Sequence, residues 1–591
     1  MSIPLIRVGH GTCGVASGAA KTYEAIKKKA EEMNIPIKLQ KVGCMGMCFN
    51  EPVVNVKING ETIYYKKITE DKVPELLAHL TTNTLFKEQV YAREFHKKEE
   101  DIHKEIPVLE QTDFFGNQKR LVMDLCGKIE PLDLKEYESR GGFSGLHKAL
   151  AMKPQEVVNE LEKSKLRGRG GAGFPTYKKW QMMLDSKAEK KVLVCNADEG
   201  DPGAFMNRNL MEGNPFRIFE GMLIAAYALG ASKGYIYTRV EYPLAIKTLK
   251  EAIRILEKNH YLGKNILNKF DFEVEIRVGA GAYVCGEETA LLESLEGKRG
   301  QPRLKPPFPV QRGAFGLPTN INNVGTYSHV TKILQLGGEY YSSLGTEKSG
   351  GTKIVCLTGN VPQTGVVEVP MGTIIKDIIV KIGHAPINGV KAIQTGGPSG
   401  GCIPFKELNI PLDYEPLLEK GSIMGSGGIV VMNYDNNMVD VSKYFLSFSA
   451  MESCGKCIPC REGTTQLIKL LEKILAGKGS KKDILVMENL SFVMKDTSLC
   501  GLGMAAPNPL LSALKYYRHE FEELILPKEE QMVFIDKDRC IGCNACSKVC
   551  PANAIKGKLG EKHEINQELC TKCKTCVSVC PVHTIHVKKK E

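Results

Sequence analysis

The chain has 591 residues, of which 42% are hydrophobic and 25% charged, so it is too long for one core, and we expect three to five domains of ordinary globular composition. The formal net charge of +11 comes largely from lysine runs near both ends, without a basic stripe interleaved with aromatic residues, so we expect no nucleic-acid partner. The sequence contains no apolar run of about eighteen residues and no basic segment leading into an apolar core, so we expect no membrane span, no export signal and a cytoplasmic location.

Residues 1–85 have the pattern of a small α/β unit. An amphipathic helix is expected over 21–33, a strand at IPIKLQKV, and a further strand and turn at VVNVKING. Between these two strands lies the loop GCMGMCFNEP, which carries two cysteines. Residues 86–114 then form a charged linker, rich in Lys, Glu and His, for which we expect helix up to about residue 110.

Residues 115–340 alternate helices, glycine loops and short apolar strands, which predicts a layered α/β domain. Strands that run into loops are expected at VLVCNADEG, GYIYTRVEY and FEVEIRVGAG, with a helix at PLAIKTLKEAIRILEK. Residues 341–435 form a small strand-rich module, residues 436–527 a helical domain, and residues 528–591 an internal repeat. We therefore expect a multidomain α/β protein.

Twelve of the twenty cysteines fall into three blocks with iron–sulfur spacing. The first block is C-x2-C-x2-C with a fourth cysteine forty residues on, and the other two are C-x2-C-x2-C-x3-C followed by proline. Zinc usually takes two separate C-x2-C pairs, so this spacing favours [4Fe–4S] clusters. The three predicted sites involve Cys454, Cys457, Cys460 and Cys500; Cys540, Cys543, Cys546 and Cys550; and Cys570, Cys573, Cys576 and Cys580.

The last two blocks match the two-cluster ferredoxin pattern, in which the fourth cysteine of each motif binds the other cluster. That pattern pairs Cys580 with the first motif and Cys550 with the second. The single cysteines are expected to be buried structural thiols; they are Cys126, Cys195, Cys285, Cys356 and Cys402.

Glycine, acidic and amide residues gather in loops of the α/β domain. The segment LRGRGGAGFPT reads formally as G-x-G-x-x-G, but a helix precedes it, so by itself it favours a plain glycine turn. Three further loops add carboxylates and amides, which suit ribityl, ribose and amide groups, and such loops converge at one end of a sheet. The loop residues are Asn196, Asp198, Glu199 and Asp201; Tyr283, Glu287 and Glu288; and Asn322 and Asn323.

Five motifs in order resemble the FMN- and NADH-binding subunit of respiratory complex I and its soluble relatives: RGRGGAGFPT, CNADE, GAYVCGEETAL, INNV and ESCGKCIPCREG. The resemblance implies FMN in the glycine loop, a nicotinamide nucleotide, NAD(H) or NADP(H), stacked over it, and a ubiquitin-like fold for the strand-rich module. It implies no bond-making catalytic residue, because hydride passes directly from nicotinamide to flavin. The implied FMN contacts are Gly168, Gly170, Asn196, Asp198, Tyr283, Glu287, Glu288, Asn322 and Asn323.

The same resemblance places a second set of residues beside the nucleotide: Phe174, Lys179 and Phe308, together with Glu288 and Tyr283. Asp201 stands where complex I commonly has Glu, and its shorter arm puts its nucleotide contact in question.

The N-terminal unit resembles a thioredoxin-like [2Fe–2S] ferredoxin, a family that uses four cysteines. Cys44 and Cys48 supply the second pair, but Cys13 has no partner at the expected spacing. Two alternatives follow. Either the cluster is lost and the unit is a vestigial docking domain, or another group such as His10 completes the site.

The whole architecture resembles the large flavoprotein subunit of soluble electron-bifurcating hydrogenase, transhydrogenase and formate dehydrogenase complexes. This implies a hetero-oligomer in which electrons pass to ferredoxin, to a catalytic iron–sulfur partner subunit and to a small [2Fe–2S] subunit. The alternatives are a non-bifurcating diaphorase subunit, a complex I-like subunit that passes electrons to a quinone, and an electron-transfer module whose flavin domain is only scaffold.

Overall fold

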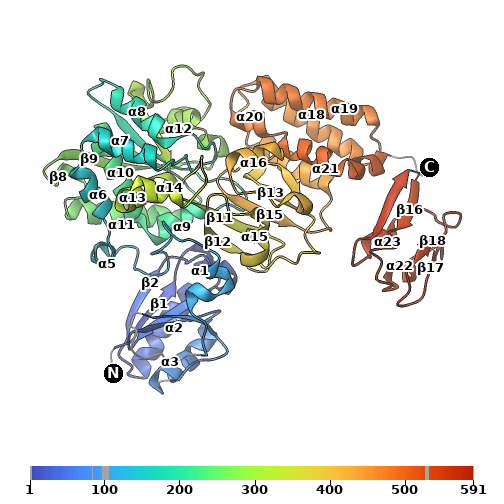
Figure 1. Ribbon diagram of the computed structural model, residues 1–591, viewed down its shortest axis with the longest axis horizontal. Helices are drawn as coiled ribbons and strands as arrows, with labels where there is room; N and C mark the ends of the chain where they lie inside the picture. Colours follow the sequence, from blue (N-terminus) through green and yellow to red (C-terminus); the bar gives the residue numbers. More distant parts are fainter. Residues whose placement is uncertain (1–2, 83, 96–104, 526–530, 590–591) are drawn as a thin grey trace.

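The computed structural model describes residues 3–82, 84–95, 105–525 and 531–589. Its units follow one another through space (Figure 1). The N-terminal unit lies at the bottom of the view, the 115–340 domain at the left, the strand-rich module in the centre, the helical domain above it and the C-terminal unit at the right. Within the described ranges, no helix is long and apolar enough to cross a membrane.

The N-terminal unit is a five-stranded sheet in the order β2-β1-β3-β4-β5, in which β1 and β2 are parallel and the other pairs antiparallel. The strands are β1 Leu5–Gly9, β2 Lys38–Val42, β3 Val54–Ile58, β4 Glu61–Tyr65 and β5 Val90–Phe95. The helices are α1 Thr12–Ala16, α2 Ala19–Glu32 and α3 Val73–Thr81.

The expected helix of the charged linker is wrong over residues 90–95, which form β5. The segment VYAREF pairs with the free edge of β4 and buries Ala92, and ladder pairing outweighs the local helical composition. Residues 96–104 of this linker lie outside the described ranges.

The 115–340 domain contains a second five-stranded sheet, in the order β10-β6-β7-β9-β8. The first four strands are parallel, and β8 is antiparallel to β9. The strands are β6 Val192–Ala197, β7 Lys233–Arg239, β8 Gly263–Ile266, β9 Phe270–Gly279 and β10 Thr319–Asn323. The strands predicted at VLVCNADEG, GYIYTRVEY and FEVEIRVGAG are confirmed as β6, β7 and β9, and the predicted helix at 243–258 is confirmed as well.

Helices surround this sheet, and the mostly apolar α10 is buried in the largest core of the described residues at every position except Tyr227. The helices are α5 Leu134–Ser139, α6 Ser144–Leu150, α7 Pro154–Lys163, α8 Thr176–Asp185, α9 Met206–Gly213, α10 Pro215–Leu229, α11 Pro243–Lys258, α12 Glu288–Leu295, α13 Val324–Leu336 and α14 Gly338–Ser343. The short helix α4, Asp113–Gly116, packs instead into the core of the strand-rich module. As the sequence predicts, the helix α7 and not a strand precedes the glycine loop.

The strand-rich module has a third sheet, in the order β12-β11-β15-β13-β14. Its elements are β11 Thr352–Gly359, β12 Gly365–Pro370, α15 Ile375–Asp377, β13 Ala392–Thr395, β14 Cys402–Pro404, α16 Tyr414–Glu419 and β15 Gly428–Met432. The helical domain that follows consists of α17 Met438–Met451, α18 Ile458–Leu475, α19 Lys481–Thr497, α20 Gly501–Ala505 and α21 Asn508–Ile525.

The C-terminal unit repeats one small motif twice. Each copy has a four-residue helix that begins after a residue in the left-handed conformation, Asn544 with φ 64° in the first and Lys574 with φ 63° in the second. The elements are β16 Gln531–Ile535, α22 Ala545–Lys548, β17 Ile555–Lys556, β18 Glu564–Ile565, α23 Thr575–Ser578 and β19 Ile585–Lys589. The β-like segment predicted after each cysteine motif is confirmed by β17 and β19.

Candidate functional site

Two adjoining cavities of about 520 Å³ each open at the carboxyl ends of the parallel strands β6 and β10. The loop between α7 and α8, which carries the glycine run, forms a wall of both. This volume lies in the range of cofactor sites in proteins. Residues of both linings include Gly170, Asn196, Glu287 and Asn323.

Thirteen of the fourteen predicted cofactor residues line one or both cavities. The first cavity is lined by Gly168, Gly170, Phe174, Lys179, Asn196, Glu287, Glu288, Phe308, Asn322 and Asn323. The second is lined by Gly170, Asn196, Asp198, Asp201, Tyr283, Glu287 and Asn323. The structure thus brings together loops that lie up to 155 residues apart in the sequence.

Glu199 is the exception, since it lies in neither lining. Its carboxylate accepts hydrogen bonds from the backbone N–H groups of Asn207 and Arg208 at 2.9 and 3.0 Å. These N–H groups belong to the first turn of α9 and have no partner within the helix. Glu199 therefore supplies their hydrogen-bond acceptor instead of facing the cavities.

Several predicted side chains hold the loops in place through bonds to their neighbours. The Asn196 amide donates to the carbonyl of Gly286 at 2.9 Å, and the Trp180 ring nitrogen donates to the Asn322 amide oxygen at 2.9 Å. The Asn323 amide oxygen accepts from the N–H of Gly325 and begins α13. These contacts fix the shape of the cavity walls before any ligand binds.

The first cavity has a wall of alternating charges. Lys179 Nζ lies 3.1 Å from one Glu288 oxygen, and Lys305 Nζ lies 2.8 Å from the other and 3.0 Å from Glu287. Although burial opposes it, Lys179 and Lys305 hold the pKa of Glu288 below its ordinary value. Lys305 was not predicted from the sequence, although it stands three residues before the predicted Phe308.

The strand-rich module forms part of the second cavity, which sequence reasoning also missed. Tyr414, Glu415 and Ser426 lie in this lining, beside the glycine loop. Ser426 and Tyr283 both donate to the carboxylate of Asp201, at 2.8 and 2.6 Å. Burial raises the pKa of Asp201 against these two bonds. Its short arm is therefore already engaged within the protein, and its contact with a nucleotide stays a prediction.

Asp198 pairs with Arg239 at 3.0 Å, yet burial outweighs this pair and raises the pKa of Asp198 from 3.8 to about 7. The folded protein then retains a proton that the unfolded chain releases near the ordinary aspartate value. The free energy of unfolding therefore falls as pH rises between these two values.

We expect Asp198→Asn to reduce this pH dependence by up to about 1.4 kcal/mol per pH unit. The measurement is the free energy of unfolding from urea titrations at about pH 5 and about pH 7. In the variant, Arg239 keeps Glu241 and the Gly281 carbonyl as partners. Part of the pH dependence of the unfolding free energy remains, because burial also raises the pKa of Glu199, to about 6. An equal slope in variant and wild type would contradict the expectation.

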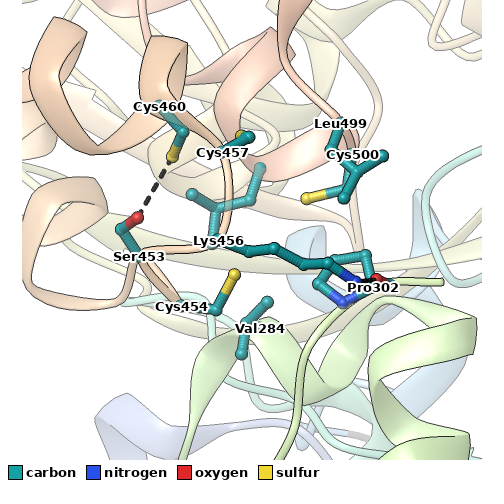
Figure 2. Close-up of a pocket in the computed structure, with 10 residues that line it drawn as sticks. Val284, Pro302, Ser453, Cys454, Lys456, Cys457, Cys460, Leu499 and Cys500 are labelled. Atoms are coloured by element: carbon teal, nitrogen blue, oxygen red, sulfur yellow. Dashed lines mark hydrogen bonds between the residues drawn. The ribbon is translucent and has the colours of Figure 1, made fainter. Parts of the chain in front are cut away.

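The four cysteines of the first predicted cluster line one small cavity (Figure 2). Cys457 and Cys460 lie at the start of α18, and Cys500 directly before α20. Lys456 donates to the Pro302 carbonyl at 2.7 Å, which ties the cysteine loop to the 115–340 domain. Four thiols around one cavity suit a [4Fe–4S] cluster.

This cluster cavity adjoins the second large cavity. Val284 and Leu502 line both of them, and the Tyr283 N–H, one residue earlier in the chain, donates to Glu452 at 2.9 Å. The loops that line the second large cavity and the loop that carries Cys454, Cys457 and Cys460 are therefore in direct contact.

The C-terminal cysteines group in the predicted crossed arrangement. One cavity is lined by Cys540, Cys543, Cys546 and Cys580, and the other by Cys550, Cys570, Cys573 and Cys576. The five single cysteines are all buried, as predicted.

Three thiols of the N-terminal unit also come together. The sulfur atoms of Cys13, Cys44 and Cys48 all lie within 4.8 Å of one another. Cys13 comes from α1, and the other two from the loop after β2. This arrangement can hold a metal, as the ferredoxin resemblance implies.

The loop that carries Cys44 and Cys48 is held by other parts of the chain. Its backbone carbonyl oxygens at Cys44, Met45 and Gly46 accept hydrogen bonds from Asn209, Arg120 and Val366, respectively. These donors belong to α9, to the segment 120–126 and to β12. The thiol site is therefore enclosed between the N-terminal unit, the 115–340 domain and the strand-rich module.

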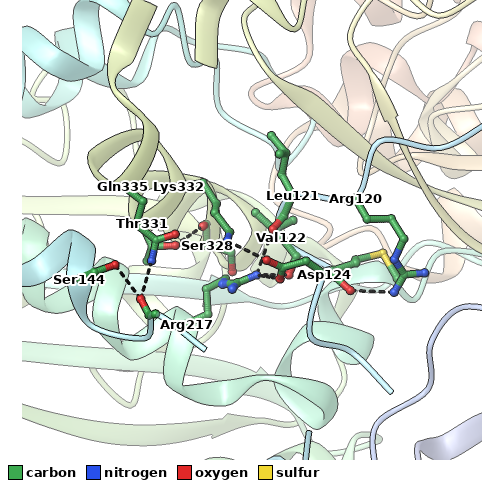
Figure 3. Close-up of polar contacts among 12 residues, drawn as sticks. Arg120, Leu121, Val122, Asp124, Ser144, Arg217, Ser328, Thr331, Lys332 and Gln335 are labelled. Atoms are coloured by element: carbon green, nitrogen blue, oxygen red, sulfur yellow. Dashed lines mark hydrogen bonds and ion pairs between the residues drawn. The ribbon is translucent and has the colours of Figure 1, made fainter. Parts of the chain in front are cut away.

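The segment 120–126 is itself anchored by partly buried ion pairs (Figure 3). Asp124 lies 2.5 Å from Arg217 and 2.7 Å from Lys332, on α10 and α13. Although burial opposes it, these two cations hold the pKa of Asp124 below its ordinary value. On the other side, Glu368 of β12 accepts from three consecutive N–H groups, those of Leu121, Val122 and Met123.

The glycine loop fits a flat cofactor. Gly170 lines both cavities, and a Cβ added there would lie 3.2 Å from the Asn323 Cβ, inside the space between the two walls. Without a side chain, the loop lets a ring and backbone N–H groups approach closely.

Comparison with known families agrees with this geometry in four places. The Nuo51 FMN-binding domain matches residues 161–332, and the NADH-ubiquinone oxidoreductase-F iron-sulfur binding region matches 440–524. A 4Fe-4S dicluster domain matches 533–587, and a thioredoxin-like [2Fe-2S] ferredoxin matches 4–81. The cofactors are therefore FMN, [4Fe–4S] clusters and an N-terminal [2Fe–2S] cluster at Cys13, Cys44 and Cys48. The alternative of an N-terminal domain without a cluster is wrong.

Whole-chain comparisons extend the match. The NADP-reducing hydrogenase subunit HndC of Solidesulfovibrio fructosivorans is 46% identical over 457 residues, which is 76% of this chain and 93% of that protein. An NADH-quinone oxidoreductase subunit of Rhizobium meliloti is 44% identical over 392 residues, 66% of this chain and 93% of that protein. A crystal structure of an NAD+-reducing [NiFe]-hydrogenase in the H2-reduced state superposes with a TM-score of 0.62 at 29% identity, covering 90% of this chain and 85% of that chain. The chain belongs to the Nuo51 family of FMN- and iron–sulfur-dependent NAD(P)H oxidoreductase subunits.

Proposed function

We propose that this chain is the flavoprotein subunit of an electron-bifurcating complex of the hydrogenase type. In it, NAD(H) or NADP(H) exchanges hydride with FMN, and single electrons leave through the clusters to ferredoxin and to a partner oxidoreductase subunit. Bound FMN supplies the conversion between two-electron and one-electron chemistry. The residues of the chain bind, orient and enclose the reactants.

The observation that carries the proposal is the contact between the flavin-type cavity and the first cluster site. Val284 and Leu502 line both cavities. The first cluster that an electron reaches from the flavin cavity is therefore the one at Cys454, Cys457, Cys460 and Cys500. The crevice between the charged wall of Lys179, Glu288 and Lys305 and the exposed rings of Phe174 and Phe308 is the nucleotide site of the proposal.

Bifurcation also needs more than one exit for electrons. The N-terminal [2Fe–2S] domain and the C-terminal two-cluster domain lie on different sides of the molecule (Figure 1). In this proposal one serves a high-potential and the other a low-potential acceptor. A small [2Fe–2S] subunit and a catalytic iron–sulfur subunit supply the other half-reaction in a hetero-oligomer, because this chain has no motif for a hydrogen-activating cluster or a molybdenum cofactor.

The test is anaerobic purification of the native complex, followed by assays of ferredoxin reduction with NADH or NADPH, with and without H2 or formate. We expect ferredoxin to be coupled to one of the two nucleotides only when the second donor or acceptor is present. Reduction of artificial dyes without coupling to ferredoxin would instead identify a plain diaphorase subunit. Coupling to a quinone would identify a complex I-like subunit.

A further inference from the structure

The N-terminal cluster site lacks one cysteine. A [2Fe–2S] cluster takes four protein ligands, and the site offers the three thiols of Cys13, Cys44 and Cys48. The cysteine that the ferredoxin spacing would place near Cys13 is absent, because Val8 and Gly18 stand at those positions. One ligand position therefore has to be filled by a different side chain.

The carboxylate of Glu51 lies beside the Cys13 thiol of this site. Its Oε1 is 3.7 Å from the Cys13 sulfur, and its Oε2 accepts a hydrogen bond from the Val53 N–H at 2.8 Å. The residue is 8% exposed. Among the ion pairs that the structure gives for the described residues, none involves Glu51.

A buried carboxylate without a cationic partner is costly, because it loses hydration without regaining charge compensation. An iron ion beside Cys13 would supply that compensation. The distance fits this role: two ligands of one tetrahedral ion, one thiolate at about 2.3 Å and one carboxylate oxygen at about 2.0 Å, lie about 3.5 Å apart. The bond from Val53 to the other oxygen would orient the ligand, as outer contacts of metal ligands commonly do.

The surrounding backbone leaves room for this carboxylate. A Cβ at Gly14 would lie 2.2 Å from the Gly9 carbonyl oxygen and 3.2 Å from Glu51 Oε2. The α1 backbone can approach the carboxylate this closely only because residue 14 has no side chain.

His10, the substitute ligand considered from the sequence, lies differently. Its backbone N–H donates to Val42, and its ring packs edge-on against Tyr23 with centroids 6.4 Å apart. Among the described residues, the ligand atoms that all lie within 4.8 Å of one another are the three thiols alone, and Glu51 is distinguished from His10 by its 3.7 Å contact with the Cys13 sulfur.

We propose that Glu51 supplies the fourth ligand of the N-terminal [2Fe–2S] cluster through Oε1, on the iron that Cys13 also binds. The cluster is then held by three thiolates and one carboxylate. This ligand set explains both the absent cysteine and the buried acid beside the site.

Glu212 provides a matched control. It is another buried carboxylate, on α9 and 6% exposed, but it accepts from the N–H of Thr12, next to Cys13, at 2.8 Å and from the Thr12 hydroxyl at 2.5 Å. Both of its oxygens thus have protein donors, and no thiol contacts it among the hydrogen bonds of the described residues.

The test uses the full chain, with Glu51→Cys, Glu51→Gln, Glu212→Gln and His10→Ala compared with wild type. The reduced [2Fe–2S] signal is recorded by EPR at a temperature at which [4Fe–4S] signals are broadened. Glu51→Cys is expected to keep a [2Fe–2S] cluster with shifted g values, a shifted reduction potential and added thiolate-to-iron absorption. Glu51→Gln is expected to lose the signal or shift it, whereas Glu212→Gln and His10→Ala keep the wild-type g values.

Two results would overturn the proposal. One is a Glu51→Cys protein with wild-type g values and a new thiol that can be alkylated while the cluster signal persists. The other is histidine nitrogen coupling in the pulsed EPR spectrum of the wild type, lost in His10→Ala. If Glu51→Gln fails to fold, Glu51→Cys still tests the proposal, because it places a stronger iron ligand at the same position.

Discussion

Gly173→Val is expected to yield a chain that purifies without flavin. Gly173 has φ 64°, in the left-handed region that valine avoids, and an added Cβ would lie 2.5 Å from the Tyr414 ring. The loop would have to move away from Tyr414, and the wall shared by the cavities would move with it. We expect the flavin content per chain to fall at least about tenfold, which corresponds to about 1.4 kcal/mol of binding free energy.

Gly428→Ala, at the start of β15 and outside both cavity linings, is the control. A Cβ there would find no atom closer than 3.5 Å, so the variant is expected to keep its flavin. Both variants should retain the iron of the wild type, because the cysteine sites lie on other segments. Flavin is measured after acid release, as the ratio to protein. Full flavin content in Gly173→Val would show that this loop is not the flavin site.

Cys580→Ser is expected to remove the cluster held by Cys540, Cys543 and Cys546. The cluster held by Cys570, Cys573 and Cys576, which stand in the same motif as Cys580, is expected to remain. The Cys580 thiol lines one cavity with Cys540, Cys543 and Cys546. Loss of one of four thiolates from a compact cluster opens it to solvent and oxidant, so we expect the iron of one cluster to be lost.

Alkylation followed by peptide mass analysis distinguishes the two arrangements. In Cys580→Ser the newly reactive thiols should be those of Cys540, Cys543 and Cys546. In the matched variant Cys550→Ser they should be those of Cys570, Cys573 and Cys576. Reactive Cys570, Cys573 and Cys576 in Cys580→Ser would instead mean that each motif binds its own cluster.

The sequence predicted best where function constrains local spacing. The crossed cysteine pattern depends on short gaps and a repeat of thirty residues, and the structure reproduces it in both cavities. The loops that follow β6 and β10 could be predicted because parallel strands end at one edge of a sheet.

Residues brought in from distant segments could not be predicted. Tyr414 and Ser426 reach the second cavity from a separate module, and nothing local marks them apart from nearby glycines. The strand β5 was missed because its charged composition favours helix, whereas its pairing with β4 depends on tertiary structure. The proposed role of Glu51 could not be predicted, because the contact of its carboxylate with Cys13, 38 residues away in the sequence, depends on the fold.

The enclosure of the N-terminal thiol loop has a consequence for biogenesis. Asn209, Arg120 and Val366, which hold the carbonyls of Cys44, Met45 and Gly46, are all synthesised after the loop itself. Iron delivered to the finished protein would have to break these contacts, whereas iron delivered to the emerging N-terminal domain would not. The order of synthesis therefore favours loading of this cluster first, and a chain that folds in iron-starved cells would close over an unmetallated site that is difficult to repair.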